Sequence, residues 1–160
     1  MRAATPDDMD AIATVWHAGW RDGHLGHVPP ALVAHRDLDE FRRRVPARMA
    51  TTTVAVDDRG DVVGFVTLHD DEVEQVYVAA AARGTGIAGA LLRDAERQVA
   101  RRFDRAWLAV VAGNARARRF YAREGWSDAG PTDYPAEIPG GTLVVQTQRY
   151  EKTLTTEGAP

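Results

Sequence analysis

The stretch VYVAAAARGTGIAGALL (Val76–Leu92) contains the strongest sequence pattern for predicting the fold of this chain. It begins with Val76-Tyr77-Val78, a run of β-branched and aromatic residues that is typical of a strand. It ends in a pattern in which Ile87 and Leu91 lie one helical step apart. Between these segments, the glycines at 84, 86 and 89 match G-x-G-x-x-G, the pattern of dinucleotide-binding turns. The stretch therefore predicts a strand, a glycine-rich loop and a helix, and raises the question of which ligand the loop would hold.

The dinucleotide interpretation fails on the position of the loop. In such domains the first glycine directly follows a strand, and an acid after the next strand binds the ribose. Here residues 79–83 separate Val78 from Gly84, and the strand predicted at 106–111 is followed by Ala-Gly-Asn without an acid. We therefore expect no NAD site. The loop still offers free backbone N–H groups at a helix N-terminus, which suits a phosphate or pyrophosphate.

The remaining segments alternate between strand and helix patterns. Alternation in the strand 72–78 would put Glu72, Glu74, Val76 and Val78 on one face. Together the segments predict an α/β (α+β) fold, a mixed sheet with helices on its faces. The expected strands are 2–5, 51–56, 62–68, 72–78, 106–111 and 142–150; the expected helices are 5–20, 38–49, 86–102 and 114–124; segments 23–30 and 126–141 are expected to be irregular. We expect one domain over 1–155 and a frayed tail at 156–160.

Composition narrows the functional classes. The formal net charge is −3, from 20 basic and 23 acidic side chains, so no nucleic-acid or membrane partner is expected. The chain has no cysteine, which excludes a thiolate nucleophile. Without an apolar leader or a membrane-spanning run, we expect a cytoplasmic protein. His17, His24 and His27 cluster in flexible surroundings, and we expect no metal site there.

Two motifs in order resemble the GNAT acetyltransferase superfamily. Arg83-Gly84-Thr85-Gly86-Ile87-Ala88 resembles its [Arg/Gln]-x-x-Gly-x-[Gly/Ala] acyl-CoA loop. About 30 residues on, Asn114-Ala-Arg-Ala-Arg-Arg-Phe-Tyr121 resembles its second signature, Asn-x-x-Ala-x-x-x-Tyr. The resemblance implies a mostly antiparallel sheet splayed between the strands that end near Val78 and Val111. It also implies acetyl-CoA as cosubstrate, and by analogy a homodimer through the C-terminal strand.

The resemblance also implies roles for single residues. The backbone of Val76 and Val78 would pair with the pantetheine arm, and Asn114 would bind the cofactor arm. The Tyr121 hydroxyl would lie beside the thioester sulfur, and the Val78 N–H would bind the oxyanion. The pyrophosphate would be held by the loop N–H groups together with Arg83; the loop residues are Gly84, Thr85, Gly86, Ile87 and Ala88. Arg118 or Arg119 is a candidate contact for the 3′-phosphate of CoA, and Gly89 is expected where the helix packs on the sheet.

Acetyl transfer to an amine requires a base, because an alkyl ammonium ion with a pKa near 10 cannot attack. Glu72 is our first candidate for the base by register, and Glu74 is the second. The alternative for each is a solvated acid on the strand. The acceptor pocket is expected over the first helix and its loop; the candidates are Trp16, Trp20, His24, His27 and, as part of a lid, Tyr134. The expected acceptor is the primary amine of a small molecule. A protein or peptide acetyltransferase (N-terminal or lysine) and a non-catalytic acyl-CoA sensor are the alternatives.

Overall fold

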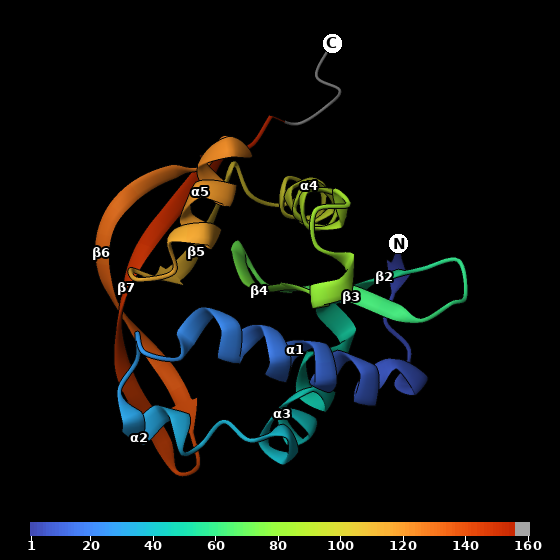
Figure 1. The fold of residues 1–160 in the computed structure, drawn as a ribbon. Helices are drawn as coiled ribbons and strands as arrows, with labels where there is room; N and C mark the ends of the chain where they lie inside the picture. Colours follow the sequence, from blue (N-terminus) through green and yellow to red (C-terminus); the bar gives the residue numbers. More distant parts are fainter. Residues whose placement is uncertain (156–160) are drawn as a thin grey trace.

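The computed structural model describes residues 1–155, which form a seven-stranded sheet with helices on both faces (Figure 1). The strand order is β1-β2-β3-β4-β5-β7-β6, and every neighbouring pair is antiparallel except β4–β5. The predicted mixed, mostly antiparallel sheet is thereby confirmed. In chain order the elements are β1 (Arg2–Ala3), η1 (Pro6–Asp8), α1 (Met9–His24), α2 (Pro30–Val33), α3 (Leu38–Arg44), η2 (Pro46–Thr51), β2 (Thr52–Val56), β3 (Val62–His69), β4 (Glu72–Val78), η3 (Ala80–Ala82), α4 (Ile87–Val99), β5 (Arg105–Val111), α5 (Ala115–Arg123), β6 (Ser127–Ile138) and β7 (Gly141–Thr153).

The two faces of the sheet bury separate hydrophobic clusters. On one face, Trp16 and Trp20 of α1 and Phe41 of α3 pack with Phe65 of β3. On the other face, α4 contributes its buried stripe and α5 its Phe120. The four-residue spacing along α4 produces that stripe, as expected for an amphipathic helix. The sheet is thus a central layer between α1 with α3 and α4 with α5.

The sheet opens between β4 and β5. Their register contains one residue pair, Glu72 with Trp107, among the residues described. In contrast, β5 pairs with β7 along its whole length, from Arg105 to Val111. The two strands therefore diverge toward Val78 and Val111, as the resemblance implied. Backbone groups on the open edge of β4 are left for another partner.

Strand β4 carries an extra residue that the alternation argument overlooks. Thr67 of β3 pairs with Gln75, and the next residue, Leu68, pairs with Val73, so Glu74 has no partner in β3. Such a bulge resets the alternation of faces. Val73 packs in the α4 cluster together with Val76 and Val78. The expectation that Glu72 and Glu74 share a face with Val76 and Val78 is therefore wrong, and the acids lie on the α1 side.

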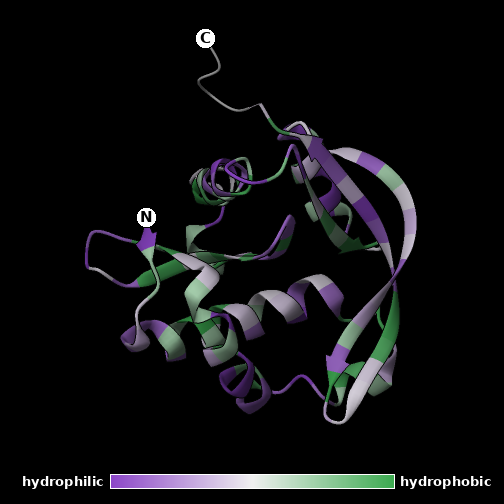
Figure 2. Ribbon diagram, turned by 180° about the vertical axis from the view of Figure 1, so that it is seen from behind, coloured by the Kyte–Doolittle hydropathy of each residue, from purple (hydrophilic) through white to green (hydrophobic). Residues whose placement is uncertain are grey.

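The expectation of an irregular segment at 126–141 is also wrong, because β6 runs from Ser127 to Ile138. Its two prolines, Pro131 and Pro135, are tolerated because β6 is the last strand of the sheet and has an unpaired outer edge. The hairpin shows alternating hydrophilic and hydrophobic bands (Figure 2). The C-terminal strand β7 is paired on both sides, so only β6 offers a free edge at this end of the sheet.

The helical boundaries differ from the expectation at two places. The helix expected at 38–49 ends at Arg44, and a 3-10 turn begins at Pro46. Proline lacks the N–H that would continue the helix. The first helix continues to His24, and a single turn, Pro30–Val33, interrupts the loop that follows. Arg36 lies over the Trp20 ring of α1, and Arg44 and Arg48 lie over its Trp16 ring. The expected tail at 156–160 lies outside the described residues.

Candidate active site

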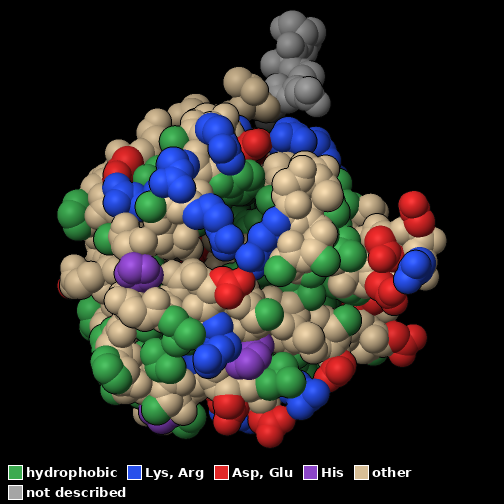
Figure 3. Space-filling model, viewed as in Figure 1, with side chains coloured by type: hydrophobic (Ala, Val, Ile, Leu, Met, Phe, Trp, Pro, Cys, Tyr) green, Lys and Arg blue, Asp and Glu red, His purple; other side chains and the backbone are tan. Residues whose placement is uncertain are grey.

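Two cavities meet at the open edge of β4. The larger one, of about 430 Å³, lies between α4, α5 and the splayed strand; the other, of about 230 Å³, lies between α1, β4 and the β6–β7 hairpin. Figure 3 shows the first as a hollow between α4 and α5 with basic side chains around it. Both linings contain Val76, Asn114 and Tyr121. We call the two spaces the cofactor cleft and the acceptor cavity.

The glycine loop forms one end of the cofactor cleft. Gly84 has a φ of 77° and Gly86 a φ of 84°, and Gly86 is the residue that caps α4. Left-handed backbone costs other residues about 1–2 kcal/mol, which explains both glycines. The first N–H groups of α4 have no partner inside the helix and face the helix entrance. Gly84, Gly86, Ile87 and Ala88 line the cleft.

The side chains of two loop residues have partners within the protein. Thr85 is exposed and its hydroxyl donates to the Ala82 carbonyl at 2.5 Å, so it stabilises the turn. Arg83 lines the cleft, and its Nη2 lies 2.6 Å from Asp22 Oδ2 of α1. The pair joins the loop to α1 at the mouth of the cleft. A bound phosphate would compete with Asp22 for this guanidinium.

Basic side chains surround the rest of the cleft. They are Arg83, Arg93, Arg116 and Arg123. Arg118, which we expected near the 3′-phosphate, instead donates to Tyr150 Oη, the Ala112 carbonyl and Asp128. Gly89 does not pack against the sheet as expected: a Cβ there would first meet Arg93 and Glu124 side chains. Seven residues, about two helical turns, separate Arg116 from Arg123, so both lie on the same face of α5 and line the cleft, whereas Arg118 lies on another face.

The backbone of Val76 and Val78 faces the opening. The Ala79 N–H donates to the Val63 carbonyl of β3 at 2.8 Å. Because successive residues of a strand direct their backbone groups to opposite edges, those of Val78 and Val76 point toward β5. No residue of β5 pairs with them in the register of the described residues. The strand therefore presents free N–H and C=O groups to the cofactor cleft.

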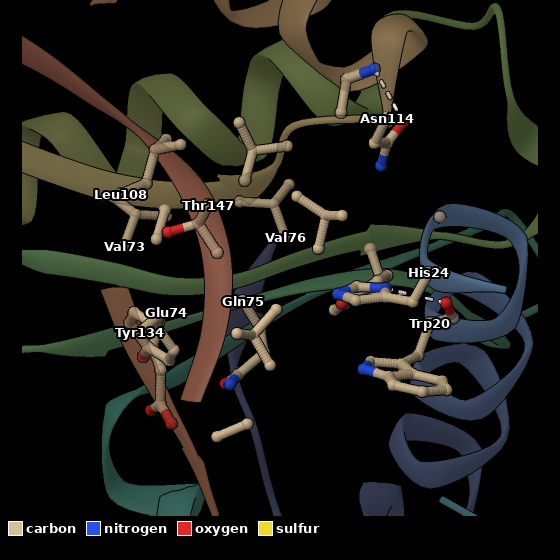
Figure 4. A pocket seen from close by; sticks show the side chains of 18 of the residues that line it. Trp20, His24, Val73, Glu74, Gln75, Val76, Leu108, Asn114, Tyr134 and Thr147 are labelled. Carbon is tan, nitrogen blue, oxygen red and sulfur yellow. Dashed lines mark hydrogen bonds between the residues drawn. The ribbon is translucent and has the colours of Figure 1, made fainter. Parts of the chain in front are cut away.

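Asn114 and Tyr121 come from the two ends of α5. The Asn114 Oδ1 accepts from the Ala117 N–H at 3.2 Å and caps the helix, which leaves the Nδ2 group facing Gly23 of α1 (Figure 4). Tyr121 lies among aromatic rings, with Trp126 and Tyr150 at centroid distances of 6.4 and 6.0 Å. Burial raises the pKa of the Tyr121 hydroxyl to about 12, so it keeps its proton at neutral pH.

The two strand acids have different surroundings. Glu72 is 8% exposed and its Oε1 accepts a hydrogen bond of 2.6 Å from the Tyr134 hydroxyl. Burial raises the pKa of Glu72 above the usual value of a glutamate, and the hydrogen bond from Tyr134 opposes that shift. Glu74 Oε1 instead lies 2.9 Å from Arg48 Nη2. Glu72 thus lacks a cationic partner among the described residues, whereas Glu74 is held in an ion pair.

Four of the five expected acceptor residues line the acceptor cavity: Trp16, Trp20, His24 and Tyr134. Tyr134 reaches it from a strand and not from a lid loop. His27 is exposed and packs against Gly113, outside both linings. The His24 ring stacks on Trp20 at 4.6 Å, and its Nδ1 lies 2.8 Å from the Trp20 carbonyl (Figure 4). Burial lowers the pKa of His24 to about 4, so the ring is neutral, with Nδ1–H donating.

Six further polar residues of this cavity were not predicted from the sequence. They are Arg36, Arg44, Arg48, Gln75, Glu137 and Thr147. Arginine triplets on helices usually form a solvated face. Here Arg42 and Arg43 do so, while the Arg44 side chain is only 11% exposed. The four-residue step from Arg44 to Arg48 is the one signal that both point the same way, and it is weak without the sheet.

Two features are absent among residues 1–155. No helix there combines the length and the apolar character that a bilayer span requires. Nor does that part of the chain bring three or more His, Asp or Glu side chains into an arrangement that could hold a metal ion.

Comparison with solved structures shows a shared fold. A GCN5-related N-acetyltransferase from Rhodopseudomonas palustris is 21% identical, with a TM-score of 0.73 and coverage of 96% of this chain and 94% of that chain. A GCN5-related N-acetyltransferase from Kribbella flavida is 24% identical (TM-score 0.70; 96% and 96%). yncA from Salmonella typhimurium, solved with its cofactor acetyl-CoA, is 20% identical (TM-score 0.69; 99% and 95%). No curated protein matches the sequence.

The comparison with family models is more specific. The model of the acetyltransferase (GNAT) family matches residues 14–126. That segment extends from α1 through α5, and so includes the glycine loop, the open edge of β4 and the Asn114–Tyr121 segment. Since it is well over half of the sequence, the chain belongs to the GNAT family of acetyltransferases.

Proposed function

We propose that this chain transfers the acetyl group of acetyl-CoA directly to the primary amine of a small molecule, with residues 1–155 acting as one acetyltransferase domain. The observation that carries the proposal is the meeting of two cavities at the open edge of β4. A thioester in the cofactor cleft and an amine in the acceptor cavity would meet beside the residues common to both linings. Val76, Asn114 and Tyr121 are among them.

The cofactor cleft has the groups that acetyl-CoA needs. The free backbone edge of Val76 and Val78 can take the pantetheine arm in the manner of an added strand. The glycine loop and the N-terminus of α4 suit the pyrophosphate, since both the unpaired N–H groups and the helix dipole favour an anion. Arg116 and Arg123, both on α5, add positive charge that suits a further phosphate. No acidic residue occupies the position where a dinucleotide-binding domain holds its ribose.

The acceptor cavity supplies a base. An alkyl ammonium ion has a pKa near 10 and must lose a proton before it attacks. Glu72, with its raised pKa and no ion-pair partner within residues 1–155, is better suited to take this proton than Glu74, which Arg48 holds. The proton passes to Glu72 directly or through water in the cavity. This choice between the two acids rests on their partners, because both lie on the same face of β4.

The transfer step then uses groups around the junction. The amine nitrogen forms the new C–N bond with the acetyl carbon, and the Val78 N–H donates to the oxygen that gains charge. The C–S bond of the thioester breaks, and the Tyr121 hydroxyl donates a proton to the leaving sulfur. The nitrogen loses its second proton as the amide forms, and that proton restores the tyrosine. The chain has no cysteine to carry the acetyl group, which favours direct transfer.

The first test is calorimetry with acetyl-CoA and with NAD, followed by an amine panel assayed through the release of free CoA. We expect acetyl-CoA to bind, NAD not to bind, and a small primary amine to accelerate release. Acceleration by peptides alone would replace the acceptor class with a protein substrate. Binding without acceleration by any acceptor would identify an acyl-CoA sensor. Absence of acetyl-CoA binding would overturn the proposal as a whole.

A further inference from the structure

Three arginines from the chain between α2 and β2 line the acceptor cavity together with Glu137 of β6. Arg36 follows α2, Arg44 ends α3, and Arg48 lies in η2. Three guanidinium groups in one enclosed space repel one another and require acceptors. The partners of each arginine therefore show whether the protein itself neutralises them.

The protein itself supplies hydrogen-bond partners for all three nitrogens of the Arg48 guanidinium. Its Nε donates to Glu74 Oε1 at 3.0 Å, its Nη2 to Glu137 Oε2 at 3.0 Å, and its Nη1 to the Arg44 carbonyl at 3.1 Å. Two carboxylates thus serve one cation. They belong to β4 and β6, so this network also ties the bulged strand to the hairpin.

Arg44 has much weaker partners. Its guanidinium stacks on the Trp16 ring at 4.7 Å, and its nearest carboxylate oxygen, Glu137 Oε2, is 3.9 Å away. That separation is too long for a hydrogen bond. The buried Arg44 Nε has no hydrogen-bond partner within residues 1–155. The Trp16 ring covers one face of the planar Arg44 guanidinium. The N–H groups on the edge of the guanidinium therefore remain available to a planar or tetrahedral oxyanion.

Arg36 and Gln75 add further unsatisfied groups to the same cavity. Arg36 is 3% exposed; its Nη atoms donate to the His35 and Glu137 carbonyls, and its buried Nε lacks a partner in the described chain. Burial lowers the pKa of Arg36 to about 10, and the neighbouring Arg44 acts in the same direction. The buried Gln75 Oε1 is likewise unpaired among residues 1–155. Buried polar groups in folded proteins are normally hydrogen-bonded, so this set points to a ligand that completes it.

We propose that the acceptor is a small primary amine that also carries an oxyanion, such as a carboxylate or phosphonate, which Arg44 and Arg36 bind. This inference rests on the proposed acetyl transfer and names its substrate class. The anion would occupy the end of the cavity at Arg36 and Arg44, and the amine would extend toward the end shared with the cofactor cleft, where Tyr121 lies. Gln75 Oε1 would accept a hydrogen bond from the same molecule. Charge-assisted bonds to a guanidinium fork are strong enough to select such acceptors.

Matched acceptor pairs test the requirement for the anion. The panel contains the proteinogenic α-amino acids, β-alanine and γ-aminobutyrate, each beside its carboxamide, with aminomethylphosphonate as the arm for a phosphorus oxyanion. Release of CoA is measured at fixed acetyl-CoA. We expect at least one acid to exceed its carboxamide by about 10- to 100-fold in kcat/KM, the range of a hydrogen bond to a charged group. The better of the carboxylate and phosphonate arms identifies the kind of oxyanion.

Substitutions of Arg44 test whether this arginine causes the preference for an acid over its carboxamide. Arg44→Gln should raise KM for the acid by about 10-fold or more while leaving the carboxamide unchanged, and Arg44→Lys should retain part of the preference because it keeps the charge. Arg43→Gln is the matched control, since Arg43 lies on the same helix, is exposed and pairs with Glu40. Circular dichroism and melting temperature establish that each variant folds.

Calorimetry of the acid and carboxamide pairs in the presence of CoA provides a second readout. Equal rates and equal binding for acids and carboxamides, or an acid preference that Arg44→Gln leaves intact, would overturn the inference. Acids that bind through Arg44 without accelerating CoA release would support the oxyanion site and contradict acetyl transfer. No binding by any acid of the panel would also overturn the inference, even if an amine without an anion is acetylated.

Discussion

Glu72 combines burial with a neutral donor, and this combination governs its reactivity. Tyr134 donates to the Glu72 carboxylate at 2.6 Å, while no cation among residues 1–155 pairs with it. Burial alone would favour the protonated acid, and the tyrosine partly restores the carboxylate. The pKa of Glu72 therefore lies above that of an exposed glutamate. That property suits a group that must accept a proton from an ammonium ion.

Glu72→Gln should lower kcat by about 10²- to 10³-fold, because glutamine cannot accept the amine proton. It should also remove the acidic limb of the kcat/KM–pH profile. Glu74→Gln is the control, since its loss removes a partner of Arg48 without removing the base. Steady-state rates across pH measure both effects. A wild-type rate in Glu72→Gln would assign the base elsewhere.

The same substitution should raise stability at neutral pH. A carboxyl whose pKa is raised in the folded state favours folding in its protonated form, below its unfolded pKa. That contribution is lost as pH rises through the folded pKa, so the charged, buried Glu72 destabilises the protein at pH 7. Glu72→Gln should therefore raise the melting temperature by a few degrees near pH 7, since about 1 kcal/mol corresponds to about 2–4 °C. The difference should vanish near pH 4 in a calorimetric scan.

Tyr134→Phe provides a directional test of the hydrogen bond. The tyrosine donor favours the Glu72 carboxylate, so its removal should raise the pKa of Glu72 further. The acidic limb of the rate profile should move to higher pH, with the plateau rate at high pH less affected. An unchanged limb would show that Glu72 is not the titrating group.

Tyr121→Phe should lower kcat by roughly 10- to 1000-fold with little change in acetyl-CoA affinity, because the ring remains and only the hydroxyl is lost. Since burial raises the pKa of Tyr121 to about 12, the wild-type rate should show no tyrosine titration below pH 10. Calorimetry for the cofactor and steady-state rates for turnover separate the two effects. An unchanged rate would remove the hydroxyl from the mechanism.

At the level of elements, the entrance of α4 depends on backbone that glycine adopts easily. Gly86→Ala should destabilise the fold by about 1 kcal/mol and weaken acetyl-CoA binding, because the strain falls on the loop that presents the N–H groups. Gly60→Ala is the matched control: Gly60 has a φ of 87°, lies in the β2–β3 turn and lines neither cavity. We expect similar losses of melting temperature in the two variants. Only Gly86→Ala should raise the Kd measured by calorimetry, and equal Kd values would separate the loop from cofactor binding.

The elements differed in how well their sequence predicted them. The α4 segment was predictable because its apolar four-residue step and its glycine loop act locally. The bulge at Glu74 was not, because it is defined by the pairing of Thr67 and Leu68 in another strand. The strand β6 was missed because its prolines mark a loop unless the strand lies at a sheet edge, which is a property of the assembled sheet.

At the level of the whole molecule, the opening between β4 and β5 joins the two cavities. A ligand that binds only the folded state stabilises it, by about 2.7 kcal/mol at a hundred times its Kd. We therefore expect saturating acetyl-CoA to raise the melting temperature by roughly 5–10 °C, and NAD at equal concentration to leave it unchanged. Differential scanning calorimetry measures both. A larger shift with NAD would contradict the assignment of the cleft.

The sequence alone determined the order of the elements other than α2 and β6, the strand, glycine-rich loop and helix of the Val76–Leu92 stretch and, through its two motifs, the family. These depend on local spacing, which the chain carries with it into any fold. Tertiary structure decided which acid is buried, which arginines of the α3 region turn inward, and that Tyr134 meets Glu72 across 62 positions of sequence. Burial and unpaired charge arise only when distant segments exclude water together, so no local pattern can specify them.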